Sequence, residues 1–287
     1  MKKILVATDF SERSDRALRR ATLLARQFGA EILLVHVVDD DQPRRIVEAE
    51  RAEASTLLTQ MAATLRDVDG VPCEALVPVA SPFLGIVQAA LDTSPDLLVI
   101  GSHRRQVLRD VFIGTTAERI IRSVERPVLM VNAPPASLYK HILATTDLSD
   151  RSKHALEHFY DLGIHDNSLN SIIYIFDVPA LRLSFSHSIS KDDKNNYMED
   201  EKRGATAALA TFVASLNRGT VRQILRHEAT TTQNEILNAA AEQQADLIVI
   251  STHGQGGLAK LLLGSVTEQV LRSSPIDVLT IPAQRER

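Results

Sequence analysis

The sequence predicts two copies of an α/β domain, each a doubly wound sheet of five parallel strands with helices on both faces. Two alignments within the chain carry this prediction. Residues 3–11 read KILVATDFS and residues 141–149 read HILATTDLS, which aligns Asp9 with Asp147 at an offset of 138. Further on, DLLVIGSH at 96–103 aligns with DLIVISTH at 246–253, at an offset of 150. A repeat of this length indicates a duplicated domain rather than a solenoid.

Apolar runs alternate with amphipathic stretches through the first copy, residues 1–134. Residues 4–8 form an apolar run that ends at a turn, as expected of a strand buried on both faces. The next helix places Ala17, Ala21 and Leu24 on one face and closes at Gly29. We expect further strands at 32–38, 73–79, 97–100 and 128–131, and helices at 48–65, at 82–91 and from 116 onward. Alternating strands and helices predict a parallel sheet.

The second copy, residues 138–283, repeats this order after a linker at Pro134-Pro135. Its strands are expected near 142–146, 171–178, 220–227, 247–250 and 277–281. The offset between the copies grows by 12 residues, which requires an insertion after the second strand. The polar stretch 179–204 fits that insertion. We expect it to be a mobile surface loop, with a lid over a site as the alternative.

Composition excludes several classes of protein. The chain has 287 residues, 44% of them hydrophobic and 24% charged, with a net charge of −4. Neither a basic balance nor a basic stripe is present, so we expect no binding to nucleic acid. No apolar run approaches the ~20 residues that span a bilayer, which predicts no membrane segment. Cys73 is the single cysteine, and no signal peptide is evident, so we expect a cytoplasmic protein.

A glycine-containing loop follows the fourth strand of the second copy. It reads Ser251-Thr252-His253-Gly254, then nine residues, then Gly264-Ser265. The glycines permit close approach of a ligand to the backbone, and the helix that follows begins SVTE, with Ser265 expected as N-cap and Glu268 at capping-box spacing. A helix N-terminus beyond the carboxyl ends of parallel strands favours an anion. The loop therefore predicts a phosphate site, with simple helix capping as the alternative.

Two other nucleotide motifs are disfavoured. The run at 254–259 fits the dinucleotide fingerprint G-x-G-x-x-A, but that fingerprint belongs to the first strand–helix turn and this run follows the fourth strand. A P-loop of the form GxxxxGK[ST] is absent from the sequence.

The whole chain resembles a tandem universal stress protein, whose ATP-binding signature is G-x2-G-x9-G-[S/T]. The resemblance implies a Rossmann-like fold related to the adenine nucleotide α-hydrolases, ATP binding in some members, and pairing of the two copies about a pseudo-two-fold axis. One chain would then resemble a homodimer of single domains, and association of two chains into a homodimer stays open.

The resemblance also implies a site in the second copy. Thr146 and Asp147 at the end of the first strand would supply the adenosine-side contacts, and the backbone near Asp177 would hold the adenine edge. The phosphate contacts fall on Ser251, His253, Gly254, Gly264, Ser265, Val266 and Thr267. Ser251 departs from the signature, which has glycine there.

The first copy departs further. Its candidate set is Asp9, Val37, Gly101, Arg104, Gly114 and Thr115. Arg104 replaces the second glycine of the signature, and its guanidinium would either block the backbone or reach a phosphate itself.

No residue set predicts catalysis. His103 and His253 lack a serine or carboxylate partner at the spacing of a triad, and the remaining histidines show no metal-ligand spacing. We therefore expect an ATP-binding regulatory protein of the stress response, with Mg²⁺ accompanying the nucleotide and at most slow hydrolysis. The alternative is a scaffold with vestigial sites, and an adenylate-transferring enzyme is disfavoured because its signatures are missing.

Overall fold

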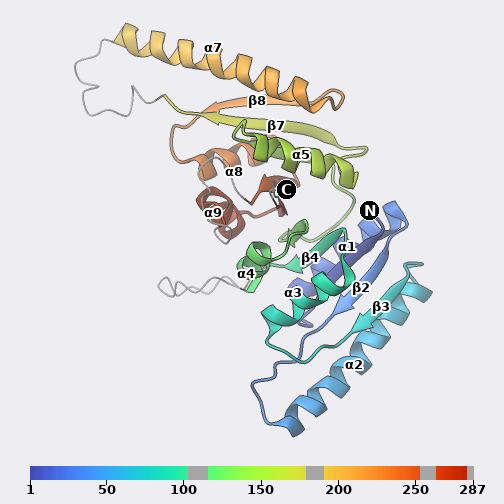
Figure 1. Cartoon of the computed structure of the whole chain (residues 1–287). Coiled ribbons are helices and arrows are strands. Elements are labelled where there is room, and N and C mark those ends of the chain that lie inside the picture. Colours follow the sequence, from blue (N-terminus) through green and yellow to red (C-terminus); the bar gives the residue numbers. More distant parts are fainter. Residues whose placement is uncertain (103–115, 179–190, 253–262, 283–287) are drawn as a thin grey trace.

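The two copies form one continuous sheet of ten strands (Figure 1), in the order β3-β2-β1-β4-β5-β10-β9-β6-β7-β8. The computed structural model describes residues 1–102, 116–178, 191–252 and 263–282, without the side chains of 191–193. The strands are β1 (Lys3–Ala7), β2 (Glu31–Val35), β3 (Cys73–Leu76), β4 (Leu97–Gly101), β5 (Val128–Val131), β6 (His141–Thr146), β7 (Leu169–Phe176), β8 (Arg222–His227), β9 (Leu247–Ser251) and β10 (Asp277–Ile281). All neighbours within a copy are parallel, as predicted.

Helices cover both faces of this sheet. They are α1 (Glu12–Phe28), α2 (Arg44–Asp67), α3 (Pro82–Thr93), α4 (Thr116–Ser123), α5 (Asp150–Leu162), α7 (Lys191–Leu216), α8 (Thr232–Glu242) and α9 (Ser265–Ser273). Side chains of α1, α2, α5 and α7 share one buried cluster, and those of α3, α4, α8 and α9 share the other. The strands supply both clusters by alternation: Ile4 and Val6 of β1 face the first, and Leu5 and Ala7 face the second. None of the helices described is long and apolar enough to cross a membrane.

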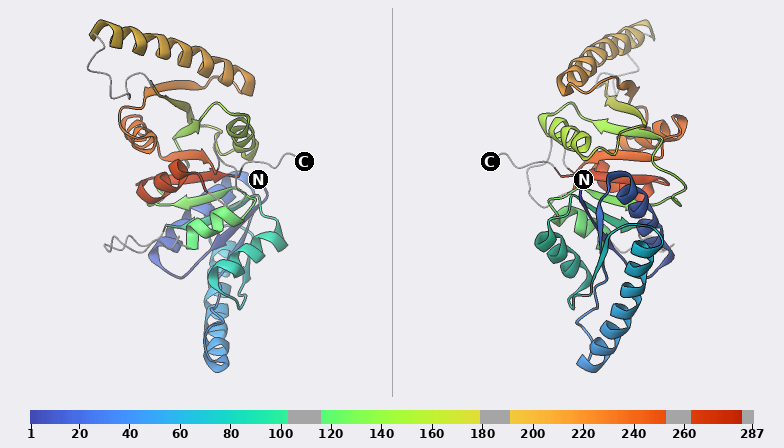
Figure 2. Two further views of the ribbon diagram at one scale, coloured as in Figure 1. Left: turned by 60° about the vertical axis from the view of Figure 1, so that its left-hand side comes forward. Right: turned by 90° about the vertical axis from the view of Figure 1, so that its right-hand side faces the viewer.

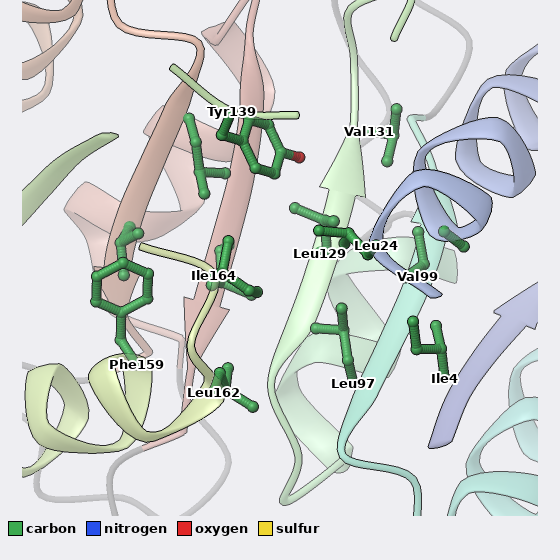
Figure 3. Close-up of a cluster of buried hydrophobic side chains, with 14 of the residues drawn as sticks. Ile4, Leu24, Leu97, Val99, Leu129, Val131, Tyr139, Phe159, Leu162 and Ile164 are labelled. Carbon is green, nitrogen blue, oxygen red and sulfur yellow. The ribbon is translucent and has the colours of Figure 1, made fainter. Parts of the chain in front are cut away.

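The copies meet at an antiparallel pair of strands. Leu129 of β5 lies opposite Leu279 of β10, with Met130 opposite Val278 on one side of that pair. The pairing places a pseudo-two-fold axis between the two leucines, in agreement with the predicted packing. Figure 3 shows side chains of both copies, among them Leu24 and Phe159, in one of the buried clusters that cross this junction. The long helices α2 and α7 therefore lie at opposite ends of the molecule (Figure 2).

Two serines and two glycines fix the ends of corresponding helices. Ser11 caps α1 and Ser149 caps α5, and each side chain accepts a hydrogen bond from the amide three residues later. Gly29 and Gly163 follow the same helices in the left-handed conformation, with φ of 63° and 77°. The duplicated sequence thus encodes duplicated helix boundaries.

The insertion in the second copy differs from the prediction. Helix α7 begins at Lys191, so the expected loop over 179–204 is wrong from residue 191 onward, and residues 179–190 lie outside the described part. This polar stretch contains good helix formers, but it lacks the apolar periodicity from which helices were predicted. Charge pairs such as Lys202 with Glu199 stabilise its exposed turns. The final turns are held by Leu209 and Phe212 in the core.

Some boundaries also differ. β2 ends at Val35 and β3 at Leu76, earlier than predicted. Beyond them the two segments stay joined by a hydrogen bond from the amide of His36 to the carbonyl of Leu76 and by an isolated bridge between Val38 and Val79. Helix α2 begins at Arg44, four residues earlier than the expected residue 48, and its first turn already buries Val47.

Candidate functional site

A tight turn follows β1 at the point where the strand order reverses, since β1 lies between β2 and β4. Thr8 Oγ1 accepts from the amide of Phe10 at 3.0 Å and donates to Ser14 Oγ at 3.0 Å. Asp9 Oδ1 accepts from the amide of Ser11 at 3.0 Å. Phe10 has φ of 60°, a left-handed conformation that an aromatic residue seldom adopts. Ligands of doubly wound sheets bind beyond the strand ends at such a reversal.

The second copy builds the same turn after β6. Thr146 Oγ1 accepts from the amide of Leu148 at 2.9 Å and contacts Ser152 Oγ at 2.9 Å. Asp147 Oδ1 accepts from both the amide and the hydroxyl of Ser149, at 3.1 and 2.5 Å. Leu148 has φ of 63°. Strained conformations persist where the surroundings fix them and cluster at functional sites, so their recurrence marks both turns.

Asp9 and Asp147 do not cap the helices themselves. The caps are Ser11 and Ser149, and each aspartate instead holds its capping serine in place. Burial raises the pKa of Asp9, but hydrogen bonds from Ser11 and Ser14 outweigh it and leave that pKa below its ordinary value. Asp9 is therefore ionised at neutral pH, beside the guanidinium of Arg13 at 4.0 Å.

A cavity of about 250 Å³ opens beside the turn of the first copy. Its walls include Asp9, Val37 and Gly101, three of the six candidates predicted for this copy. Ile86 and Ile120 form part of its apolar side. The cavity thus joins an ionised carboxylate to an apolar wall, the combination typical of small-molecule sites. The other three candidates, Arg104, Gly114 and Thr115, lie outside the described residues.

Gly101 is required by packing against helix α1. A Cβ at this position would lie 2.8 Å from the carbonyl carbon of Arg13 and 3.0 Å from the amide nitrogen of Ser14. The first turn of α1 therefore approaches the end of β4 more closely than a side chain allows. Gly101 thereby brings the Asp9 turn to the edge of the cavity.

The start of α9 is tied to the end of β9 in the second copy. The amide of Gly264 donates to the carbonyl of Thr252 at 2.9 Å, and Thr267 Oγ1 donates to the carbonyl of Ser251 at 2.9 Å. Ser251, Gly264, Ser265, Val266 and Thr267 are thus brought together. His253 and Gly254 lie outside the described residues.

The predicted cap of α9 is wrong. Gly264 is the N-cap, without a side-chain hydrogen bond, and Ser265 is already the first helical residue. Glu268 does not reach back to close a capping box: it pairs with Arg122 at 3.0 Å and with Arg272 at 2.7 Å. A helix without a side-chain cap leaves its first amides, at Ser265 to Thr267, without partners inside the helix. That arrangement suits an external anion.

Asp177, expected at the adenine edge of the second copy, is not the counterpart of Val37, the candidate in the first copy. Ala7 pairs with Val35, and its counterpart Thr145 pairs with Ile173, so the second-copy counterpart of Val37 is Ile175. Asp177 lies two residues further on. Sequence reasoning missed Ile175, although counting along the aligned strands from the DFS and DLS turns would have found it.

Two further features were missed. Arg13 and His36 line the cavity. Arg13 could have been found from the pattern Ser-acid-Arg-Ser, which is repeated at 11–14 and 149–152.

Across the copies, Arg272 pairs with Glu118 at 2.8 Å, and Arg122 pairs with Glu268 at 3.0 Å. The hydrogen bond that Arg272 donates to Glu118 raises the pKa of Arg272. No pattern within one copy could reveal pairs that join two copies.

Comparison with known proteins identifies the family. The family model described as "Universal stress protein family" matches residues 1–132 and again residues 138–282. A universal stress protein of Mycolicibacterium smegmatis is 23% identical over 295 residues, which covers 97% of this chain and 96% of that protein. "Universal stress protein E" of Salmonella typhi is 24% identical over 302 residues, with 97% and 93% covered.

A single-copy relative and a solved structure agree with this result. "Universal stress protein A homolog 1" of Coxiella burnetii is 29% identical over 146 residues, covering 50% of this chain and 96% of its own. The crystal structure of a universal stress protein from Archaeoglobus fulgidus has the same fold, with a TM-score of 0.70, 20% identity and 98% of both chains covered. Since the family model matches both copies, the chain belongs to the universal stress protein family.

Proposed function

We propose that the chain binds ATP together with Mg²⁺ and acts as a cytoplasmic, nucleotide-responsive regulatory protein. The observation that carries the proposal is the turn shared by both copies at the reversal of strand order, with a cavity of about 250 Å³ beside it in the first copy. The family resemblance of the glycine-containing loop supplies the identity of the ligand.

In the second copy, Thr146 and Asp147 would hold the adenosine side of the nucleotide. The amides of Ser265, Val266 and Thr267 at the start of α9 would receive the phosphates, next to Ser251 and Gly264. His253 and Gly254 complete the proposed set. The position of Ile175 makes its backbone a better candidate for the adenine edge than that of Asp177.

In the first copy, the cavity would take the nucleoside, with Asp9 at its polar end and Val37 at its base side. The phosphates would then lie toward the start of α4, where Gly114 and Thr115 precede Thr116. Arg104 belongs to the same proposed set, where its guanidinium would either block the backbone or reach a phosphate itself.

The chemistry of the aspartates favours binding over catalysis. Asp147 accepts two hydrogen bonds from Ser149, and Asp9 is held by Ser11 with its pKa lowered, so both suit a ligand-orienting carboxylate better than a general base. Mg²⁺ in protein sites commonly binds phosphate oxygens of the substrate, which the bound ATP would supply here. We therefore propose a regulatory role with at most slow hydrolysis.

The test is direct measurement of nucleotide binding. We expect mass spectrometry of small molecules released from the purified chain to detect an adenine nucleotide, and calorimetry to detect binding of ATP with Mg²⁺. Asp147→Asn should weaken binding at the second copy by about tenfold, the value of a lost charge-assisted contact. Asp200→Asn, on the exposed part of α7, is the matched control.

Two outcomes would contradict the proposal. A chain with no bound nucleotide and no thermal shift with ATP would favour the scaffold alternative. Ser251 and Arg104, which depart from the ATP-binding signature, would fit that alternative. An unchanged affinity in both Asp147→Asn and Gly254→Arg would show that the second-copy site is wrongly assigned.

A further inference from the structure

The cavity of the first copy crosses the reversal of strand order from one side to the other. Val37, which follows β2, lies on one side of the cavity, and Gly101, at the end of β4, lies on the other. β1 lies between these two strands, and Asp9 follows its end. A ligand whose base lies against Val37 would therefore direct its other end toward Gly101.

Arg13 lies on the Gly101 side of this cavity. Its carbonyl carbon is 2.8 Å from the place that a Cβ of residue 101 would take, so the two backbones are in close contact. Among the described residues that line the cavity, Arg13 is the only arginine or lysine. Its side chain is 33% exposed, which leaves the guanidinium open to a ligand that enters from solvent.

The guanidinium of Arg13 is not committed to a close partner within the chain. The next arginine of α1, Arg16, pairs at 2.5 Å with Glu12, four residues earlier. Arg13 has the same spacing from Asp9, but its Nη2 lies 4.0 Å from Oδ2, too far for a hydrogen bond. Asp9 instead uses its other oxygen to accept from the amide of Ser11. The donors of Arg13 are therefore available to a ligand.

The second copy keeps an arginine at this position although the charges around it change. The ten residues from Ser11 read SERSDRALRR, and their counterparts in the second copy read SDRSKHALEH. Arg151 is the counterpart of Arg13, whereas Arg19 is replaced by Glu157. The duplication thus retains the arginine that faces the cavity and not one that only covers the surface of the helix.

A guanidinium in this position is suited to an anion. It is planar and permanently charged, and it binds phosphate oxygens through two parallel N–H bonds. We propose that Arg13 binds the phosphate end of the nucleotide in the first-copy cavity and makes that site select nucleotides over nucleosides. This inference rests on the proposed function. It adds to that function a ligand-contacting residue and a basis for selectivity.

The neighbouring carboxylate makes the selectivity steeper. Asp9 is ionised, and its charge would repel the phosphates of a nucleotide bound beside it, while Arg13 at 4.0 Å offsets that charge. Loss of Arg13 therefore removes an attraction and leaves a repulsion. Both effects act on a charged nucleotide, and neither acts on a neutral nucleoside.

Titration of the full chain with two ligands tests the proposal. Calorimetry measures the affinity for adenosine and for ATP with Mg²⁺, in the Asp147→Asn background so that the first copy dominates the signal. We expect Arg13→Gln to weaken the binding of ATP at least tenfold and that of adenosine less than twofold. Arg13→Lys keeps the charge without the paired donors and should lie between Arg13→Gln and the unsubstituted residue.

Arg16→Gln is the matched control, since it removes the same charge from the same helix. It should leave both affinities within twofold. Equal weakening of adenosine and ATP by Arg13→Gln would mean that this residue only positions the turn at Asp9, and an equal loss of ATP binding in the control would mean that the net charge of α1 is responsible. Either result would overturn the proposal. Failure of the unsubstituted chain to bind ATP would instead contradict the proposed function itself.

Discussion

Arg20 in the first copy and Asp277 in the second form a buried ion pair, with Nε 3.1 Å from Oδ2 and side chains 6% and 0% exposed. Tyr139 donates to the same oxygen at 2.7 Å, and its ring lies under the guanidinium at 4.1 Å. The other carboxylate oxygen accepts from the amides of Asn132 and Ala133, at 2.9 and 3.1 Å. The carboxylate at the start of β10 therefore holds both helix α1, through Arg20, and the linker that follows β5.

Replacement of that carboxylate should cost much of the stability of the chain. Asp277→Ala leaves Arg20 and the Tyr139 hydroxyl buried without their acceptor, and breaking a buried pair in this way costs about 3–5 kcal/mol. Urea unfolding followed by circular dichroism measures the loss. Asp15→Ala, which breaks the exposed pair with Arg19, should cost at most about 1 kcal/mol. A loss for Asp277→Ala as small as that of the control would contradict the buried network.

Gly101→Ala should destabilise the first copy. The new Cβ would meet the backbone of Arg13 and Ser14 at 2.8–3.0 Å, and a backbone cannot rotate away as a side chain can. We expect a loss of about 1–3 kcal/mol, the usual cost of overpacking, measured by thermal and urea unfolding.

Gly204→Ala provides the opposite control. Gly204 lies exposed within α7, and a Cβ there would meet nothing within 4 Å. Alanine should stabilise the helix by about 0.5–1 kcal/mol, since glycine costs more conformational entropy. A gain in both variants would mean that α1 does not approach β4 as closely as described.

The strands and the order of elements could be predicted from the sequence because buried parallel strands consist of uninterrupted apolar residues. Ile4 to Ala7 and Leu247 to Ile250 have no competing interpretation. The turns at Asp9 and Asp147 were found because the duplication repeats them. Helix α7 was missed because its first half is polar on all sides, so the helix formers there show no apolar stripe.

The parts of the site that depend on two elements at once could not be predicted. The role of Gly101 depends on how closely α1 approaches β4, and the partner of Glu268 comes from the other copy. Spacing suggested that Glu268 closes a capping box, but the arginines at 122 and 272 offer it a charged partner, which is stronger than a backbone amide. Local patterns carry no information on such competition.

Helix caps give a test of that correction. Ser149→Ala removes the side chain that accepts from the amide of Ser152 and should cost about 1 kcal/mol. Ser265→Ala should change the free energy of unfolding by less than about 0.5 kcal/mol, because Ser265 lies exposed inside the helix and Gly264 is the cap. Urea unfolding without nucleotide measures both. A loss near 1 kcal/mol for Ser265→Ala would restore it as the cap.

The aligned copies make His158 the second-copy counterpart of Arg20 and Pro127 the first-copy counterpart of Asp277, so the ion pair has no equivalent in the other pair of positions. Nδ1 of His158 is buried and has no hydrogen-bond partner among the described residues. Burial lowers the pKa of His158, and Arg126 lowers it further, while Asp161 and Asp96 oppose the shift. The duplicated interface therefore holds an ion pair on one side and a neutral imidazole on the other.

The stability of the chain should consequently fall in mild acid. Because the pKa of His158 is lower in the folded than in the unfolded chain, the unfolded chain takes up the proton first, and stability present above the unfolded value of 6.5 is lost as the pH falls below it. Unfolding in urea at pH 7.5 and 5.5 should show a smaller decrease for His158→Phe than for the unsubstituted chain. His154→Phe removes a histidine from the exposed side of the same helix and corrects for that loss alone. An equal decrease in the His158→Phe variant would mean that this imidazole takes up its proton in the folded chain as readily as in the unfolded one.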